Sequence, residues 1–273
     1  MSFNIYQKIC TIFFGALAVF WAILFATSTK GMLANDLFAF AYGLIPLFGG
    51  AAAMVGYRKW GGLSTILGKA ILLLGFGLFL WGAGESVYAY YNIFLHVAIP
   101  YPSIADIFFA PSVFFYTLGA IYLSRTTGIG IGLRSRIGKA FTVIAPILVL
   151  ALAYYIFIVI GRGGQLLPDS TNLLKTILDI AYPLGDFISL TISVIVAGLS
   201  FRYLGGRYKY DVIFILIGLA LMFVADSVFS YTTTLGTKFN GDFGDLIFTC
   251  AVFFLTCGLL GFNKIKTEVA PAD

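Results

Sequence analysis

Long apolar stretches separated by short polar segments run through the whole chain of 273 residues. Each stretch reaches the length of about 20 residues that a helix needs to cross the hydrocarbon core of a bilayer. The roughly ten-residue alternation that is typical of a membrane-spanning barrel is absent. We therefore predict an all-α integral membrane protein with eight transmembrane helices. The predicted spans are residues 9–29, 35–57, 66–92, 104–124, 138–161, 171–201, 211–233 and 244–262.

Composition supports the same class of protein. Apolar residues make up 60% of the chain and charged residues 11%, with a mean hydropathy of +0.98, whereas a soluble domain is about half apolar and a quarter charged. The spans leave only short connections, so we expect one eight-helix transmembrane domain over residues 1–262, a short cytoplasmic tail over 263–273 and no separate catalytic domain. The lipid bilayer is the expected partner, and nucleic-acid binding is not indicated.

Lysine and arginine are distributed unevenly between the two sides of the predicted spans. If the N-terminus is cytoplasmic, 13 of the 17 basic residues lie on the cytoplasmic side, as the positive-inside rule requires. We therefore expect a multi-pass protein of the cell membrane with both termini in the cytoplasm. The cytoplasmic set is Lys8, Arg58, Lys59, Lys69, Arg125, Arg134, Arg136, Lys139, Arg202, Arg207, Lys209, Lys264 and Lys266.

Six acidic residues lie inside the predicted spans or at their ends. A carboxylate at the centre of a bilayer costs about 2.5 to 3.5 kcal/mol on insertion scales, so such groups normally face a bundle interior or a hydrated cavity. All six fall in the outer halves of their spans, which predicts one acidic pocket that opens outward. The six are Glu85, Asp106, Asp179, Asp186, Asp226 and Asp245.

Tyrosine and proline residues extend this candidate site. Tyr88, Tyr101, Tyr182 and Tyr231 lie close to the acids in sequence, and their hydroxyl groups can donate hydrogen bonds to carboxylates. Pro183 lacks an N–H, so the carbonyl of residue 179 loses its helical donor and can turn toward a cation or a hydroxyl. Hard cations such as Ca²⁺, Mg²⁺ or Na⁺ take oxygen ligands, and the candidate metal ligands are Asp179, Asp186, Glu85 and Asp226.

The two halves of the chain are similar to each other. Residues 106–119 align without gaps on 245–258 and are identical at seven of fourteen positions. Upstream, Glu85-Ser-Val-Tyr-Ala-Tyr90 aligns on Asp226-Ser-Val-Phe-Ser-Tyr231, and Ala41-Tyr42 aligns on Ala181-Tyr182. We predict two four-helix repeats, at about 1–125 and 138–262. Because four spans are an even number, the repeats should insert in the same direction about an axis along the membrane normal.

The motifs Tyr101-Pro-Ser-Ile-Ala-Asp106 and Tyr182-Pro-Leu-Gly-Asp186, with Glu85-x-x-Tyr88 and Asp226-x-x-Phe229, resemble the multi-span sensory modules that precede diguanylate cyclase or histidine kinase domains in prokaryotes. The resemblance covers most of residues 75–260. It implies sensing outside or within the membrane with a cytoplasmic output. Since no output domain follows residue 262, we expect the protein to act through a protein partner or as a homo-oligomer.

Sequence alone leaves several functions open. The first is a receptor-like protein that binds a cation or a small ligand in the acidic and tyrosine-rich pocket. A structural or accessory subunit of a membrane complex and an ion or small-solute transporter are alternatives, although no charged residue lies deep in the inner half of a span. The zinc hydrolases of the ceramidase type use several histidines, and His96 is the only histidine here. A carboxylate-based lipid hydrolase stays open, because Tyr182-Pro-Leu-Gly-Asp186 has some similarity to lysoplasmalogenase-like enzymes, but no catalytic residue is predicted.

Overall fold

The computed structural model of the chain describes residues 3–97, 100–165, 172–200 and 208–263. Within these ranges there are eight helices long and apolar enough to cross a membrane, and every regular element is a helix. The predicted helical fold, with eight helices able to cross a membrane by length and composition, is confirmed for the described residues. The predicted tail beyond residue 263, together with Arg202, Arg207, Lys264 and Lys266, lies outside the described residues.

The eight long helices follow the predicted spans closely. They are α1 (Ile5–Ala26), α2 (Leu33–Gly56), α3 (Ile66–Ile93), α4 (Asp106–Ser124), α6 (Arg136–Ala153), α7 (Leu173–Ser200), α8 (Lys209–Thr234) and α9 (Phe243–Gly261). Shorter elements are the 3₁₀ turns η1 (Tyr57–Trp60) and η2 (Gly62–Ser64), the one-turn helix α5 (Ile129–Gly132) and the π-helical segment η3 (Tyr154–Ile160), which continues α6.

Polar capping residues explain where several helices begin. The side chains of Asn4, Thr65, Ser135 and Asp242 each accept a hydrogen bond from the backbone N–H three residues further on, which satisfies one of the free donors at a helix N-terminus. Residue 4 also forms a capping box with Gln7. The first helix therefore begins four residues before the start of the predicted span, because a cap lies outside the apolar run that follows it.

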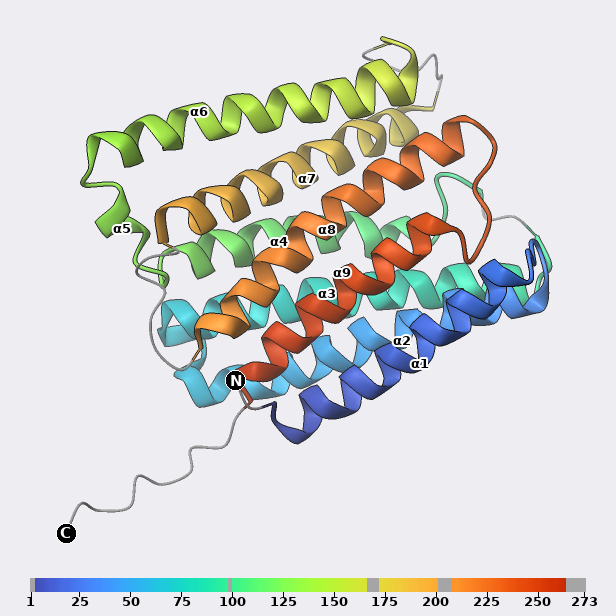
Figure 1. Cartoon of the computed structure of the whole chain (residues 1–273), viewed down its shortest axis with the longest axis horizontal. Helices are drawn as coiled ribbons and strands as arrows, with labels where there is room; N and C mark the ends of the chain where they lie inside the picture. Colours follow the sequence, from blue (N-terminus) through green and yellow to red (C-terminus); the bar gives the residue numbers. More distant parts are fainter. Residues whose placement is uncertain (1–2, 98–99, 166–171, 201–207, 264–273) are drawn as a thin grey trace.

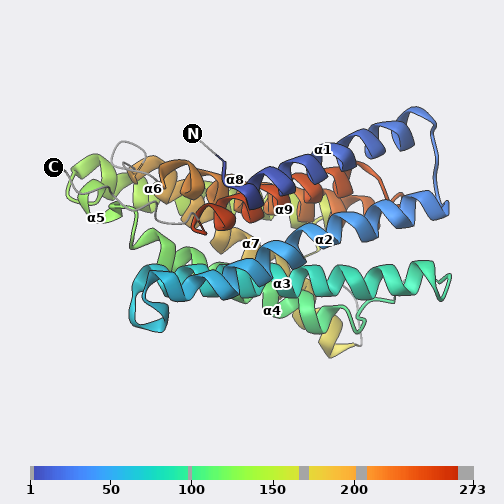
Figure 2. The ribbon, with the colours of Figure 1, turned by 90° about the horizontal axis from the view of Figure 1, so that it is seen from below.

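The helices lie side by side along the longest axis of the molecule (Figure 1). Consecutive helices pack as antiparallel neighbours within each half of the chain, and the halves meet where α2 and α1 pack against α9 and where α4 packs against α7. Figure 2 shows α3 and α4 on one side of the bundle and α1, α8 and α9 on the other. The helix α9 lies at the centre, since 72% of the residues in its most apolar stretch are buried, against 17% for α1.

The antiparallel order gives the bundle two distinct ends. We call the end that carries residues 27–32, 94–97, 100–105, 161–165 and 235–242 the cavity end, and the other the opposite end. At the opposite end the start of α1 and the end of α9 meet, where the Asn4 amide donates to the Leu260 carbonyl at 2.7 Å. Trp60 donates from its indole N–H to the Phe262 carbonyl at 2.9 Å. These contacts close the opposite end around residues from both halves.

Glycine allows α9 to pack directly against the backbone of α8. A methyl group in place of the Gly258 hydrogen would lie 2.7 Å from the Asp211 carbonyl oxygen and 3.0 Å from the Ile215 backbone nitrogen. Small residues at helix contacts are typical of membrane bundles, where close packing replaces the hydrophobic effect as the force between helices.

We predict that Gly258→Ala destabilises the bundle by about 1 to 3 kcal/mol, because the added methyl group forces two rigid backbones apart. Thermal unfolding of the purified protein measures the effect. Gly15→Ala is the control, since a methyl group there meets no atom within 4 Å and alanine is the better helix former. Equal unfolding temperatures for the two variants would contradict the packing argument.

Candidate functional site

A cavity of about 850 Å³ lies among the helices and extends to the cavity end. Its lining residues come from α2, α3, α4, η3, α7, α8 and α9, and from the turns that follow α3, η3 and α8. Most lining residues lie in the half of each helix nearest the cavity end: α2 contributes only Ala39 and Tyr42, and α9 only Asp245 and Phe248. The deepest ones, Tyr116 of α4, Ser189 of α7 and Leu219 of α8, lie just past the middle of their helices. The cavity therefore ends inside the bundle and does not extend to the opposite end.

All six acidic residues singled out in the sequence line this one cavity. They come from five helices: α3 carries Glu85, α4 carries Asp106, α7 carries Asp179 and Asp186, α8 carries Asp226 and α9 carries Asp245. The described basic residues that line it are Arg162, Lys175 and Lys238. Carboxyl groups thus outnumber cations by two to one around the cavity.

Two of these acids are held at the mouth of the cavity by tyrosines from the facing half of the chain. The Tyr182 hydroxyl donates to Asp106 Oδ1 at 2.7 Å, and the Ser103 backbone N–H donates to Asp106 Oδ2 at 2.7 Å. The Tyr101 hydroxyl donates to Asp179 Oδ1 at 2.9 Å. These bonds tie α4 and its preceding turn to α7 across the boundary between the halves.

Proline in α7 frees a backbone carbonyl that the structure uses. Pro183 lies inside α7 and cannot donate to the Asp179 carbonyl, four residues earlier. The Arg162 guanidinium donates to that carbonyl instead. The expectation that this oxygen turns toward a cation is met, and the cation is a side chain of the turn that follows η3.

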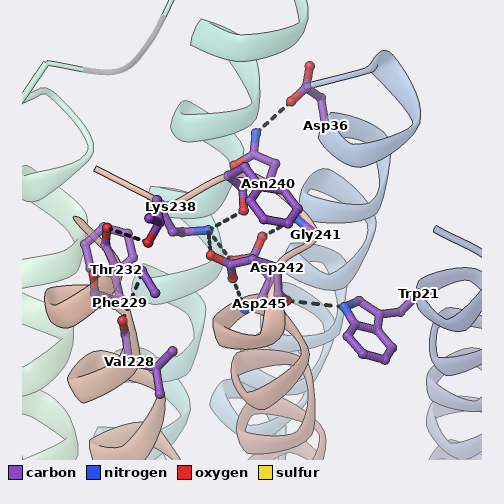
Figure 3. A network of polar contacts seen from close by, with 12 residues as sticks. Trp21, Asp36, Val228, Phe229, Thr232, Lys238, Asn240, Gly241, Asp242 and Asp245 are labelled. Carbon is purple, nitrogen blue, oxygen red and sulfur yellow. Dashed lines mark hydrogen bonds and ion pairs between the residues drawn. The ribbon is translucent and has the colours of Figure 1, made fainter. Parts of the chain in front are cut away.

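The turn between α8 and α9 places a lysine among the acids (Figure 3). Lys238 Nζ lies 2.8 Å from Asp245 Oδ1 and 3.5 Å from Asp242 Oδ2, and it donates to the Phe239 carbonyl at 3.0 Å. The Gly241 backbone N–H donates to Asp245 Oδ2 at 2.6 Å. Both oxygens of this carboxylate are therefore paired.

The same turn is attached to the first two helices (Figure 3). The Asn240 amide donates to Asp36 Oδ1 at 2.7 Å, and the Trp21 indole N–H donates to the Asp242 carbonyl at 3.2 Å. Contacts from α1 and α2 thus fix the turn that carries Lys238. They hold its ammonium group at the edge of the cavity.

Lys238 and Tyr101, which line the cavity from turns between helices, have raised pKa values. Burial lowers the pKa of Lys238, but the charges of Asp245 and Asp242 outweigh this and raise its pKa overall. Burial, followed by the hydrogen bond to Asp179, raises the pKa of Tyr101. At neutral pH the lysine therefore stays charged, and the tyrosine keeps the proton that it donates.

The deeper part of the cavity is arranged differently from its mouth. At 1.5 Å per residue, Asp186 lies about 20 Å along α7 from the start of that helix. Its carboxyl group is in hydrogen-bonding contact with that of Asp226 on α8. The Tyr116 hydroxyl of α4 lies near Asp226 and has no hydrogen-bond partner among the described residues. Glu85 interacts with the Tyr42 hydroxyl of α2. We call Asp186, Asp226 and Tyr116 the cavity floor.

Three of the four predicted tyrosines line the cavity: Tyr88, Tyr101 and Tyr182. Tyr231 does not, and it is exposed. It follows Asp226 by five residues, and five residues rotate a helix by about 140° away from the acid. The expectation that it faces the acids is therefore not met.

The polar residues that line the cavity but were not predicted from the sequence include Tyr42, Tyr116, Arg162 and Lys238. The internal repeat contained the signal for the first, because Tyr42 aligns on Tyr182. A lysine seven residues before Asp245 was a signal for the last. Nothing in sequence spacing indicates that the other two side chains enter the cavity.

The four proposed metal ligands do not form a metal centre in this structure. Among the described residues, no group of three or more His, Cys, Asp or Glu side chains could hold a metal ion. Asp179 is bound by Tyr101 at the mouth, whereas Asp186 and Asp226 face each other at the floor. The carboxylates are thus spread around a cavity and do not converge on a point.

Comparison of the chain with protein-family models, with curated protein sequences and with solved structures gives no match. The geometry of the cavity is therefore the basis for any functional argument.

We predict that Lys238→Met destabilises the protein by about 3 to 5 kcal/mol, because it leaves two buried carboxylates without their cation. Thermal unfolding measures the loss, and Lys59→Met, on an exposed lysine of η1, is the control. Combining Lys238→Met with Asp245→Asn should recover part of the loss. A double variant less stable than the single one would contradict the ion pair.

The pH dependence of unfolding gives a second measure of the same ion pair. Since folding raises the pKa of Lys238 above its usual 10.5, the stabilisation is complete below pH 10.5 and is lost as the pH rises through the higher value in the folded protein. Lys238→Met should lack this alkaline decline.

Proposed function

We propose that this chain is a receptor-like multi-pass membrane protein that binds a small organic cation or a hydroxylated ligand in the cavity and acts through a protein partner. The observation that carries the proposal is the convergence of six carboxyl groups from five helices on one cavity. Intramembrane carboxyl groups are costly and normally mark ligand or ion sites.

The size and the walls of the cavity favour an organic ligand. Cavities of about 300 to 1,000 Å³ are typical of small-molecule sites, and this one has a volume of about 850 Å³. Trp81, Phe109, Phe157, Phe229 and Phe248 contribute aromatic side chains to its lining. Aromatic faces and carboxylates together attract organic cations. A bare Ca²⁺, Mg²⁺ or Na⁺ ion would need oxygen ligands that converge on one point, and the described acids do not form such a group.

Binding without transport is the simplest interpretation of a cavity that ends inside the bundle. The deepest lining residues, Tyr116, Ser189 and Leu219, lie only just past the middle of their helices, so the cavity offers no path to the opposite end in this conformation. The motif resemblance to prokaryotic sensory modules supports a signalling role and a partner on the cytoplasmic side.

We also propose that the protein consists of two four-helix repeats, α1 to α4 and α6 to α9, that insert in the same direction. Exchange of the halves converts the α2–α9 contact into the α7–α4 contact, and both contacts are present. The crossing of α3 with α4 resembles that of α8 with α9: a methyl group on Gly77 would lie 3.0 Å from the Ser112 carbonyl, and one on Gly218 would lie 3.0 Å from the Ala251 carbonyl. Ser112 and Ala251 are equivalent in the repeat alignment.

The repeat also accounts for the tyrosines that cross between the halves. Tyr182 of the second half donates to Asp106 of the first. Its equivalent Tyr42, in the first half, lies near Asp245 of the second. Asp186 breaks this symmetry, because it aligns on Pro46. A second difference lies at the mouth, where Asp179 aligns on Ala39.

The proposed orientation has the cavity end outside the cell and both chain ends in the cytoplasm, as the distribution of lysine and arginine favours. Single cysteines test it in a background in which Cys10, Cys250 and Cys257 are replaced by alanine. A membrane-impermeant maleimide should label Ser28→Cys, in the turn after α1, in intact cells. It should label Ser64→Cys, in η2, only after permeabilisation. The reverse labelling pattern would contradict the orientation.

Ligand binding is tested with protein in lipid nanodiscs and a panel of choline, 2-phenylethylamine, inositol, CaCl₂, MgCl₂ and NaCl. We expect an organic cation or the polyol to raise the unfolding temperature, since a ligand at 100 times its Kd stabilises by about 2.7 kcal/mol. Glu85→Gln should weaken this binding at least tenfold. Lys59→Met, on an exposed lysine at the opposite end, should leave it unchanged.

Flux separates a receptor from a transporter. Proteoliposomes that contain the protein should take up the bound compound no faster than protein-free liposomes. Uptake that Glu85→Gln abolishes would make the protein a transporter, and a panel in which no compound stabilises the protein would sink the receptor proposal.

A further inference from the structure

The cavity floor differs from the cavity mouth in the partners of its polar groups. At the mouth, the carboxylates of Asp106, Asp179 and Asp245 accept from tyrosine hydroxyls, backbone N–H groups or the Lys238 ammonium. At the floor, Asp186 and Asp226 face each other, and no ion pair with a lysine or arginine joins either of them within the described part of the chain. The floor lacks the cations that the mouth has.

A third polar group at the floor has no partner. The Tyr116 side chain lines the cavity and is 4% exposed, and its hydroxyl makes no hydrogen bond to any described residue. It lies near the Asp226 carboxyl. Buried hydroxyl groups are nearly always hydrogen-bonded, so an unpaired one that faces a cavity indicates a contact which a ligand supplies.

The three floor groups come from three helices and line the same cavity. Asp186 belongs to α7, Asp226 to α8 and Tyr116 to α4, and the contacts between α4 and α7 and between α7 and α8 hold these helices together. Two carboxyl groups and one hydroxyl oxygen offer three acceptors. A primary ammonium group carries one positive charge and three N–H donors in a compact tetrahedral arrangement.

We infer that the cavity floor binds the primary ammonium group of an organic amine, with one N–H directed to each of Asp186, Asp226 and Tyr116. This inference rests on the proposed function, because it names the ligand class of the same cavity. The ammonium group lies between the two carboxyl groups, in place of their contact with each other, and it gives the tyrosine oxygen a donor.

The walls above the floor determine what the rest of the amine is like. Phe109 of α4 and Phe229 of α8 line the cavity between the floor and the cavity end, and their apolar surfaces suit a hydrocarbon or aromatic body. Lys238 provides a model for the head group within the same cavity, because its own ammonium is held by a carboxylate and a carbonyl oxygen and lies 5.9 Å from the centre of the Phe229 ring. The ligand class is therefore a primary amine with an apolar body.

Three matched compounds test the head group in nanodiscs. 2-Phenylethylamine has the three N–H donors, its N,N,N-trimethyl derivative keeps the charge without any donor, and 2-phenylethanol lacks the charge. We expect the primary amine to raise the unfolding temperature at concentrations at least tenfold lower than the other two compounds. Equal or tighter binding of the trimethyl compound would overturn the three-donor geometry.

Two substitutions test the floor residues. Asp186→Asn and Tyr116→Phe should each weaken 2-phenylethylamine binding at least tenfold, and the matched control Tyr122→Phe, on the same helix but outside the cavity lining, should not. Tyr116→Phe should also unfold at the same or a higher temperature than the wild-type protein without ligand, because it removes an unpaired buried hydroxyl. A variant that keeps full amine affinity would overturn the assignment of that residue.

Failure of this inference can be distinguished from failure of the proposed function. If 2-phenylethylamine does not bind but another panel compound binds in a manner that Glu85→Gln weakens, the ammonium site is wrong and the receptor proposal stands. If NaCl alone stabilises the protein and Asp186→Asn removes that effect, the floor binds a monatomic cation and the inference is wrong. If no compound binds, both proposals fail.

Discussion

The acidic groups inside this bundle impose the constraint on which the rest of its cavity depends. A carboxyl group taken out of water must find donors or a cation within the protein, since hydrocarbon offers neither. Around the mouth, the chain satisfies this requirement with its own groups: tyrosine hydroxyls reach across from the facing half, and Lys238 enters from a turn that α1 and α2 hold in place. These polar contacts thus join particular helices and turns, in addition to the close packing between helices.

Close packing of backbones provides the frame that makes these polar contacts possible. In a membrane, helices gain little by hiding apolar side chains from lipid, so they depend on van der Waals contact at small residues. Gly77 and Gly119 on one side, and Gly218 and Gly258 on the other, bring α3 against α4 and α8 against α9 at similar close approaches. The pair α3 and α4 and the pair α8 and α9 therefore hold their acidic residues at defined positions along the cavity. Side chains on α2 and α7 then complete the cavity between these pairs.

The mouth and the floor of the cavity differ in how their polar groups are paired. The mouth carboxylates have hydrogen-bond donors or a lysine as partners, whereas the floor has an unpaired tyrosine hydroxyl and no ion pair among the described residues. A fully paired polar network stabilises a fold, whereas buried acceptors without a donor raise the free energy of the empty protein and favour any ligand that supplies one. The Tyr116 hydroxyl is such a group. Neither Tyr116 nor Asp186 has an equivalent tyrosine or acid in the repeat, where Leu255 and Pro46 occupy the corresponding positions. The repeat therefore does not account for these two floor residues.

Sequence by itself determined the eight apolar helices and the six acids that meet in the cavity, because the cost of burying charge or exposing backbone polar groups in lipid leaves few alternatives. It also indicated that the Asp179 carbonyl is free, since a proline four residues later cannot donate to it. Only the tertiary structure decided which groups pair. Arg162 and Lys238 come from turns whose paths depend on distant helices, Tyr231 faces away by its rotation on α8, and the encounter of Tyr116 with Asp226 depends on how α4, α7 and α8 pack. Such contacts depend on distances between elements, which the pattern of residues along one chain does not specify.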